Sequence, residues 1–222
     1  MSDELLMIVT SNGTLGDSGL PTGAWLEEVC VPLKAFRDAG LAVAVASPLG
    51  GRPPIDPNSE SFDTSAVPDL EAWLAGTSAL AAVDPARYAA VFLAGGHGTM
   101  WDFAGNEALA QIVSNVASRG VVAAVCHGPA GLLDAVDEGG KPLVAGRTVT
   151  AFSDAEEDEA GASDVIPFSL QQRLAALGAA VEVAAPFTAN VRRDGNLVTG
   201  QNPASSAAVA GAAIAAVRDL RE

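Results

Sequence analysis

The chain has 222 residues, enough for one sizeable α/β domain spanning 1–222, and its 27 acidic and 12 basic residues give a formal net charge of −15. This charge repels nucleic acid and anionic lipid, which excludes both nucleic acid and membrane surfaces as expected partners. The acidic start, the lack of an apolar run long enough for a bilayer, and two cysteines without disulfide or metal spacing favour a reducing, cytoplasmic location.

Strand-type and helix-type patterns alternate through the first half of the chain. Short apolar runs predict strands, and apolar residues recurring every three or four positions predict helices. The predicted strands are 5–10, 41–46, 88–94 and 121–125, and the predicted helices carry apolar positions from Trp25 to Phe36, then cover 69–82 and 106–119. This alternation predicts a doubly wound, mostly parallel sheet flanked by helices.

One long segment between these elements, 47–68, is too rich in turn residues for regular structure. A loop of this length in a compact domain is usually functional or disordered. The sequence leaves open whether it covers a site.

The second half of the chain is less regular. Its patterns predict a strand at 148–152, an acidic helix from 153, a helix at 168–177 and a strand at 180–184. Asp194-Gly195 between β-type flanks predicts a small hairpin over 191–199, and an alanine-rich helix follows it.

The stretch Val121 to Gly131 is the feature around which the rest is arranged. Its apolar run suits a central strand buried on both faces, and it ends abruptly at Cys126-His127-Gly128-Pro129 before a segment of helix formers. A cysteine in such a strand–turn–helix corner resembles the nucleophile elbow of hydrolases and faces the positive end of the helix. This predicts a lowered thiol pKa and a nucleophilic Cys126; the alternative is a small, buried core cysteine.

A cysteine nucleophile also needs donors for a developing oxyanion. The backbone N–H groups of His127 and of Gly95-Gly96, at the end of a neighbouring predicted strand, are candidates. The alternative for these glycines is a flexible turn without a ligand. His97 is the only other histidine, and no metal-type spacing of cysteine or histidine is present, so we predict no metal site.

Two acidic pairs are candidates for the proton chemistry. Glu27 and Glu28 lie on the first predicted helix, and Glu28 flanks its inward face more closely, where a carboxyl group would share a proton with the thiol and have a raised pKa. Glu156 and Glu157 follow the strand at 148–152, where one of them would orient His127. Acidic residues at helix starts are also common because they suit the helix dipole, so the pattern alone leaves both pairs open.

Five motifs stand out along nearly the whole chain: Ala123–Ala130 (AAVCHGPA), Ala94–Gly98 (AGGHG), Pro21–Gly23 with Glu28, Val149–Phe152 with Glu157, and Thr199–Ser205 (TGQNPAS). Together they resemble the ThiJ/PfpI superfamily. The best agreement is with the heat-shock-chaperone branch that contains the glutathione-independent glyoxalases (glyoxalase III), which implies a flavodoxin-like fold of the class I glutamine amidotransferase type.

The resemblance implies a role for each matching position. Cys126 would be the nucleophile, His127 the acid/base, Glu157 the carboxylate that orients His127, and Glu28 the protonated partner of the thiolate. Glu157 fits the family's spacing, while Glu156 stays open as its alternative. Oxyanion and substrate contacts are expected from Gly95, Gly96, His97 and Asn202.

The implied reaction converts methylglyoxal or glyoxal, with water, into lactate or glycolate through a hemithioacetal on Cys126, without a cofactor. The expected partners are therefore a small dicarbonyl or aldehyde substrate and a second copy of the chain in a homodimer. The alternatives are a cysteine hydrolase (deglycase, amidase or peptidase) of the same superfamily, or a non-enzymatic stress chaperone or redox sensor.

Overall fold

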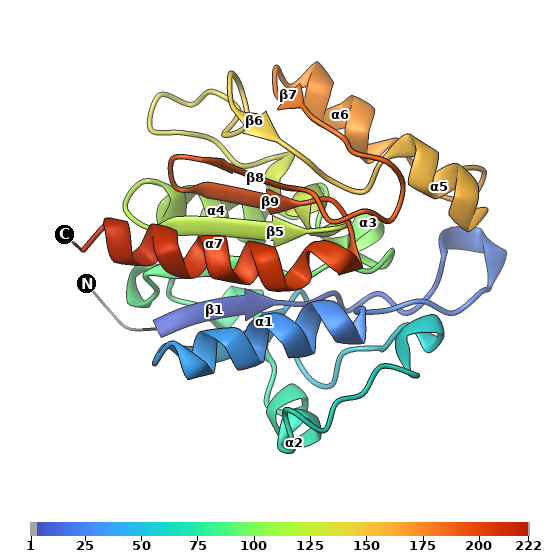
Figure 1. The fold of residues 1–222 in the computed structure, drawn as a ribbon, viewed down its shortest axis with the longest axis horizontal. Coiled ribbons are helices and arrows are strands. Elements are labelled where there is room, and N and C mark those ends of the chain that lie inside the picture. Colours follow the sequence, from blue (N-terminus) through green and yellow to red (C-terminus); the bar gives the residue numbers. More distant parts are fainter. Residues whose placement is uncertain (1–3, 222) are drawn as a thin grey trace.

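A seven-stranded sheet forms the middle layer of the molecule in the computed structural model, which describes residues 4–221 and so omits most of the acidic start (Figure 1). The strand order is β3-β2-β1-β4-β5-β9-β8, and every neighbouring pair is parallel except β8–β9. The predicted α/β fold, with a mostly parallel sheet and a hairpin near the C-terminus, is confirmed. The bounds are β1 Glu4–Ile8, β2 Ala42–Ser47, β3 Ser78–Ala79, β4 Ala90–Leu93, β5 Val121–Val125, β8 Val191–Asp194 and β9 Leu197–Gly200.

Helices cover both faces of this sheet (Figure 1). Side chains alternate between the faces, so Phe92 of β4 packs in the core under α1 and α7, whereas its neighbour Leu93 packs in the core under α4. Two apolar layers therefore hold the central strands between helices. The helices are α1 Leu26–Asp38, α2 Leu70–Ala75, α3 Thr99–Asp102, α4 Glu107–Ala117, α5 Asp154–Ala160, α6 Leu170–Ala176 and α7 Ser206–Asp219.

A second, two-stranded parallel sheet pairs β6 Thr148–Val149 with β7 Ala180–Val181. The segment after β6 is tied to the main sheet, because the Phe152 N–H donates to the Cys126 carbonyl at 2.9 Å. The chain then enters α5, whose Ser153 and Glu156 form a capping box. The start of α5 is thus held at the carboxyl edge of the central strands.

Four predicted elements differ from the structure. The helix predicted at 69–82 is wrong beyond Ala75, because the chain turns at Gly76 and β3 pairs with β2 as the edge strand of the sheet. The strands predicted at 148–152 and 180–184 are only two residues long each. The helix expected after Cys126 is a five-residue 3₁₀ helix, Gly128–Leu132, and all five of its residues are buried.

The long segment 47–68 is irregular, as predicted, apart from a 3₁₀ turn at Pro57–Ser59 and a bridge between Ala24 and Ile55. The Ser59 hydroxyl accepts a hydrogen bond from the Leu26 N–H at the start of α1. This segment therefore fixes the beginning of the first helix. Within residues 4–221, no helix is both long and apolar enough to cross a membrane.

The turn after β5 tolerates no side chain at Gly128, because a Cβ atom there would lie 2.3 Å from the Leu93 carbonyl oxygen. We expect Gly128→Ala to lower the free energy of unfolding by about 1–3 kcal/mol or more, since backbone must move to relieve the clash. Gly211 of α7 is the matched control, because its Cβ would meet no atom within 4 Å. Gly211→Ala should raise stability by about 0.5–1 kcal/mol, as for any glycine in a helix interior. Denaturant titration of both variants measures this, and equal stabilities would contradict the packing argument.

Candidate active site

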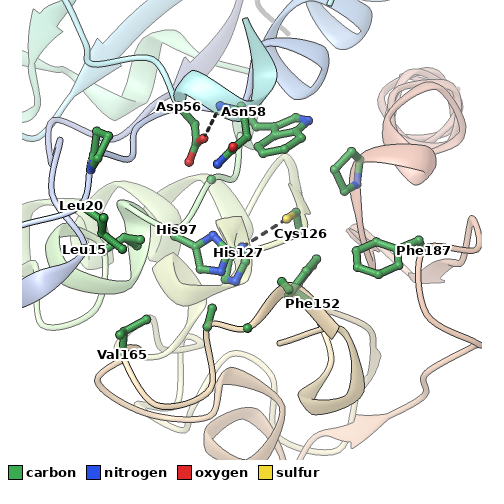
Figure 2. A pocket seen from close by; sticks show the side chains of 17 residues that line it. Leu15, Leu20, Asp56, Asn58, His97, Cys126, His127, Phe152, Val165 and Phe187 are labelled. Carbon is green, nitrogen blue, oxygen red and sulfur yellow. Dashed lines mark hydrogen bonds between the residues drawn. The ribbon is translucent and has the colours of Figure 1, made fainter. Parts of the chain in front are cut away.

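Cys126 sits at a sharp corner where β5 ends. Its φ of 60° lies in the left-handed region that non-glycine residues rarely adopt. Hydrogen bonds hold the backbone before and after the Cys126 Cα atom. The Cys126 N–H donates to the Gly200 carbonyl, and the Cys126 carbonyl accepts from the Phe152 N–H, both at 2.9 Å. Strained backbone of this kind is concentrated at functional sites, where it aims a side chain. The thiol lines a cavity whose walls include Asp56 and Asn58 of the 47–68 segment (Figure 2).

The His127 ring lies between the thiol and Glu157. Its Nδ1 is 3.2 Å from the Cys126 Sγ, and its Nε2 is 2.7 Å from the Glu157 Oε1. Although burial alone would raise it, the adjacent imidazoles lower the pKa of Glu157 to about 2, so this group is a carboxylate. A carboxylate only accepts, so the Nε2 must carry the proton and Nδ1 is left as an acceptor facing the thiol.

His127 is suited to act as a base. Burial, followed by the nearby His97, lowers the pKa of His127 below its ordinary value despite the opposing effect of Glu157. The ring is therefore neutral near pH 7 and can take the thiol proton. The sequence left open whether this side chain faces the thiol, and the structure places it there.

His97 joins the same carboxylate from the loop after β4. Its Nε2 lies 2.9 Å from the Glu157 Oε2, and the two imidazole rings are 4.0 Å apart. His97 was expected only to contact substrate, and its sharing of Glu157 with His127 was not predicted from the sequence. The signal that could have found it is that both histidines follow central parallel strands, whose carboxyl ends meet at one edge.

Glu28 approaches the thiol from the first turns of α1. Its side chain is fully buried, and its Oε2 accepts the Gly95 N–H at 2.8 Å. Burial raises the pKa of Glu28 to about 8, against smaller opposing effects of Cys126 and Gly95. Glu28 therefore keeps its proton at neutral pH, whereas Glu27 is partly exposed and lies outside the site.

Burial, one carboxyl group and two backbone amides shift the pKa of the Cys126 thiol. Burial, and then the Glu28 carboxyl, raise the pKa of Cys126, while the backbone N–H groups of Gly96 and His127 lower it. The expected lowering by a following helix is wrong, because only a 3₁₀ turn follows and burial dominates. The two backbone N–H groups of Gly96 and His127 instead stabilise negative charge on the sulfur, or on a substrate oxygen bound next to it.

Gly95 and Asn202 do not have the positions expected of substrate contacts. The Gly95 N–H is already bonded to Glu28, so it is not free to form an oxyanion hole. A Cβ on Gly95 would lie 2.4 Å from Glu28, so this glycine serves close packing. Asn202 is fully buried behind the cavity wall and is bonded to Glu156, Thr188 and Ser205.

Glu156 is separated from His127 by its own network. Its carboxylate accepts the Ser153 N–H in the capping box, the side-chain amides of Gln201 and Asn202, and the Phe187 N–H. The structure thus brings Glu157, and not its neighbour, to the histidines. Glu156 instead holds together the segments that form the cavity wall.

The cavity above the thiol has a volume of about 490 Å³. Cys126, His127, His97 and Gly96 form its reactive floor, and Asp56 and Asn58 of the 47–68 segment line another wall (Figure 2). The long segment therefore contributes directly to the site.

His97, His127 and Glu157 also form a group that could hold a metal ion, with their ligand atoms all within 4.8 Å of one another. The sequence predicted no metal from the absence of ligand spacing, but ligands from distant segments meet here. Each imidazole Nε2 already shares a hydrogen bond with one Glu157 oxygen, His97 with Oε2 and His127 with Oε1. A metal ion would have to displace both hydrogen bonds.

The buried Glu28 makes stability depend on pH. Its pKa rises from an ordinary 4.5 to about 8 on folding, so the folded protein keeps a proton that the unfolded chain releases. Its contribution is fully present below about pH 4.5 and is lost as pH rises through about 8. We expect Glu28→Gln, which cannot ionise, to gain in melting temperature relative to the native chain between pH 6 and pH 9. Glu27→Gln, at the partly exposed neighbouring position, should gain less, and parallel melting curves for Glu28→Gln and the native chain would contradict the assignment.

The chain is similar to known proteins over nearly its whole length. The DJ-1/PfpI family model matches residues 20–216. The glutathione-independent glyoxalase hsp3101 of Schizosaccharomyces pombe is 32% identical over 250 residues, spanning 100% of this chain and 99% of the relative. The structure of glyoxalase III from Candida albicans superposes with a TM-score of 0.88 at 31% identity, covering 96% of each chain. The Rapid Encystment Protein 24 KDa of Francisella tularensis superposes with a TM-score of 0.92 at 34% identity, covering 98% of this chain and 99% of that one. The resemblance found in the sequence is confirmed: this chain belongs to the DJ-1/PfpI family, in its glyoxalase III branch.

Proposed function

We propose that this chain is a glutathione-independent glyoxalase that converts methylglyoxal or glyoxal into lactate or glycolate. The observation that carries the proposal is the relay of Cys126 Sγ, His127 and Glu157, with separations of 3.2 and 2.7 Å, at the floor of an open cavity. Relatives at about 30% identity along nearly their whole length are named glyoxalases, which supports the same chemistry.

The first step is attack of the Cys126 sulfur on the aldehyde carbon. The thiol proton passes to the His127 Nδ1, which faces it with a free lone pair. The aldehyde oxygen becomes an alkoxide beside the Gly96 and His127 amides, and it then takes the thiol proton from His127 to become the hydroxyl of a hemithioacetal. Glu28 keeps its proton through this step, so no second negative charge opposes the sulfur.

The second step moves hydrogen within the bound substrate. His127 removes the proton from the carbon attached to sulfur and returns one to the adjacent carbonyl carbon by way of an enediol. The first carbon is thereby oxidised to a thioester and the second reduced to an alcohol, so the electrons balance inside the molecule. Water then hydrolyses the thioester, releasing the 2-hydroxy acid and restoring the thiol.

The homodimer and the reducing compartment stay predictions.

Methylglyoxal turnover tests the proposal directly. In the absence of glutathione, the native chain should form lactate from methylglyoxal, and Cys126→Ala should form none while keeping its melting curve. Lactate is measured by chromatography together with loss of methylglyoxal. An inactive native chain, or equal lactate from Cys126→Ala, would contradict the proposal.

The two adjacent glutamates should separate function from stability. Glu157→Gln removes the carboxylate that fixes the His127 tautomer, and we expect kcat to fall by about 100-fold or more with little loss of stability. Glu156→Gln disturbs the five hydrogen bonds that this carboxylate accepts in the cavity wall, and we expect it mainly to lower the melting temperature. Matched assays of kcat and thermal unfolding compare them; the reverse pattern would transfer the role to Glu156.

A further inference from the structure

The cavity is much larger than the substrate that its chemistry suggests. Its volume of about 490 Å³ falls in the range of roughly 300–1,000 Å³ that encloses drug-sized ligands. Methylglyoxal has only three carbons and would leave most of this space to water. The excess volume is therefore available to a larger group attached to the reacting carbonyl.

Apolar side chains surround the reactive floor. Figure 2 shows Leu15, Leu20 and Val165 to one side of His97, and Phe187 on the other side of Cys126. The polar groups are concentrated at Cys126, His97 and His127 and at the Asp56 wall. A ligand that fits both parts has one carbonyl end and an apolar body.

Two large apolar side chains on the cavity wall remain exposed. Leu20 is 56% exposed and Phe187 is 48% exposed. Phe187 also has a φ of 55°, in the left-handed region, and its N–H is held by Glu156 at 2.9 Å. Exposed apolar groups and strained backbone are both costly, and their coincidence at a cavity is typical of ligand contact.

The charge of the wall selects against anionic tails. Within residues 4–221, the side chains lining this cavity include no lysine or arginine, whereas Asp56 is among them. The whole chain also has a net charge of −15. A phosphorylated or carboxylated substrate would find no cationic partner here.

We propose, building on the glyoxalase function above, that the preferred substrates are uncharged 2-oxoaldehydes that carry an apolar alkyl or aryl group larger than methyl. The reaction is R–CO–CHO plus water to R–CH(OH)–COOH, with the same internal transfer of electrons and no outside oxidant. The R group lies against Leu20 and Val165, while the aldehyde carbon meets Cys126.

A series of straight-chain 2-oxoaldehydes tests the proposal, from methylglyoxal to 2-oxooctanal, with phenylglyoxal and a carboxylate-tailed analogue added. We expect kcat/KM to rise by up to about fourfold for each methylene that becomes buried, and the anionic analogue to be the poorest substrate. Leu20→Ala should lower kcat/KM for 2-oxooctanal by about tenfold or more while changing the value for methylglyoxal much less. Leu49→Ala is the matched control, because Leu49 is an exposed leucine outside this cavity and should leave both values unchanged.

The outcomes distinguish this proposal from the function on which it rests. Turnover of methylglyoxal with a flat or falling series, or with equal effects of Leu20→Ala and Leu49→Ala, overturns the apolar-substrate proposal and leaves the glyoxalase function standing. A preference for the carboxylate-tailed analogue also overturns it. Failure of every 2-oxoaldehyde, with a folded protein and a Cys126 that reacts with iodoacetamide, overturns both.

Discussion

The structure depends on a buried acid pair, the Cys126 thiol and the Glu28 carboxyl. Burial raises the pKa of each, and the Glu28 carboxyl raises the pKa of the Cys126 thiol further, so the pair does not carry two negative charges at neutral pH. The surrounding backbone is arranged around this constraint: Gly95 has no side chain because Glu28 occupies its space, and its N–H holds the carboxyl. The sulfur can therefore lose its proton only toward His127, the neutral base in contact with it.

Two neighbouring carboxylates at the start of α5 have different roles, one toward the histidines and one in the cavity wall. Glu157 faces two histidines and stays ionised, whereas Glu156 faces backbone and amide donors in the wall. Adjacent helix residues point about 100° apart, so one turn can supply both a site and its support. His97 strengthens this arrangement, because together with burial it lowers the pKa of His127 and keeps that ring neutral. The apolar wall and the reactive floor are thus joined through Glu156 and Glu157.

Much of this arrangement was predictable from sequence, because the central strands are continuous apolar runs and Cys126 ends one of them. Local patterns could not show where distant segments meet. The pairing of His97 with Glu157 spans 60 positions, and the choice between Glu156 and Glu157 depends on the direction of one helical turn. Asn202 was expected to contact substrate, but a polar residue after a strand can also hydrogen-bond within the cavity wall, as Asn202 does with Glu156. The helix predicted at 69–82 ends early because pairing of β3 with β2 outweighs helix propensity there.

The most direct test of this account is the protonation state of Glu28 in the folded protein. Infrared difference spectroscopy on protein with isotope-labelled glutamate, with Glu28→Gln as the reference, reports the carbonyl stretch of a protonated carboxyl group. A protonated Glu28 gives this band at pH 6 to 7 and loses it as pH rises through about 8. The absence of the band at pH 6, from a Glu28 that is already ionised, would show that no neutral Glu28 accompanies the reacting sulfur.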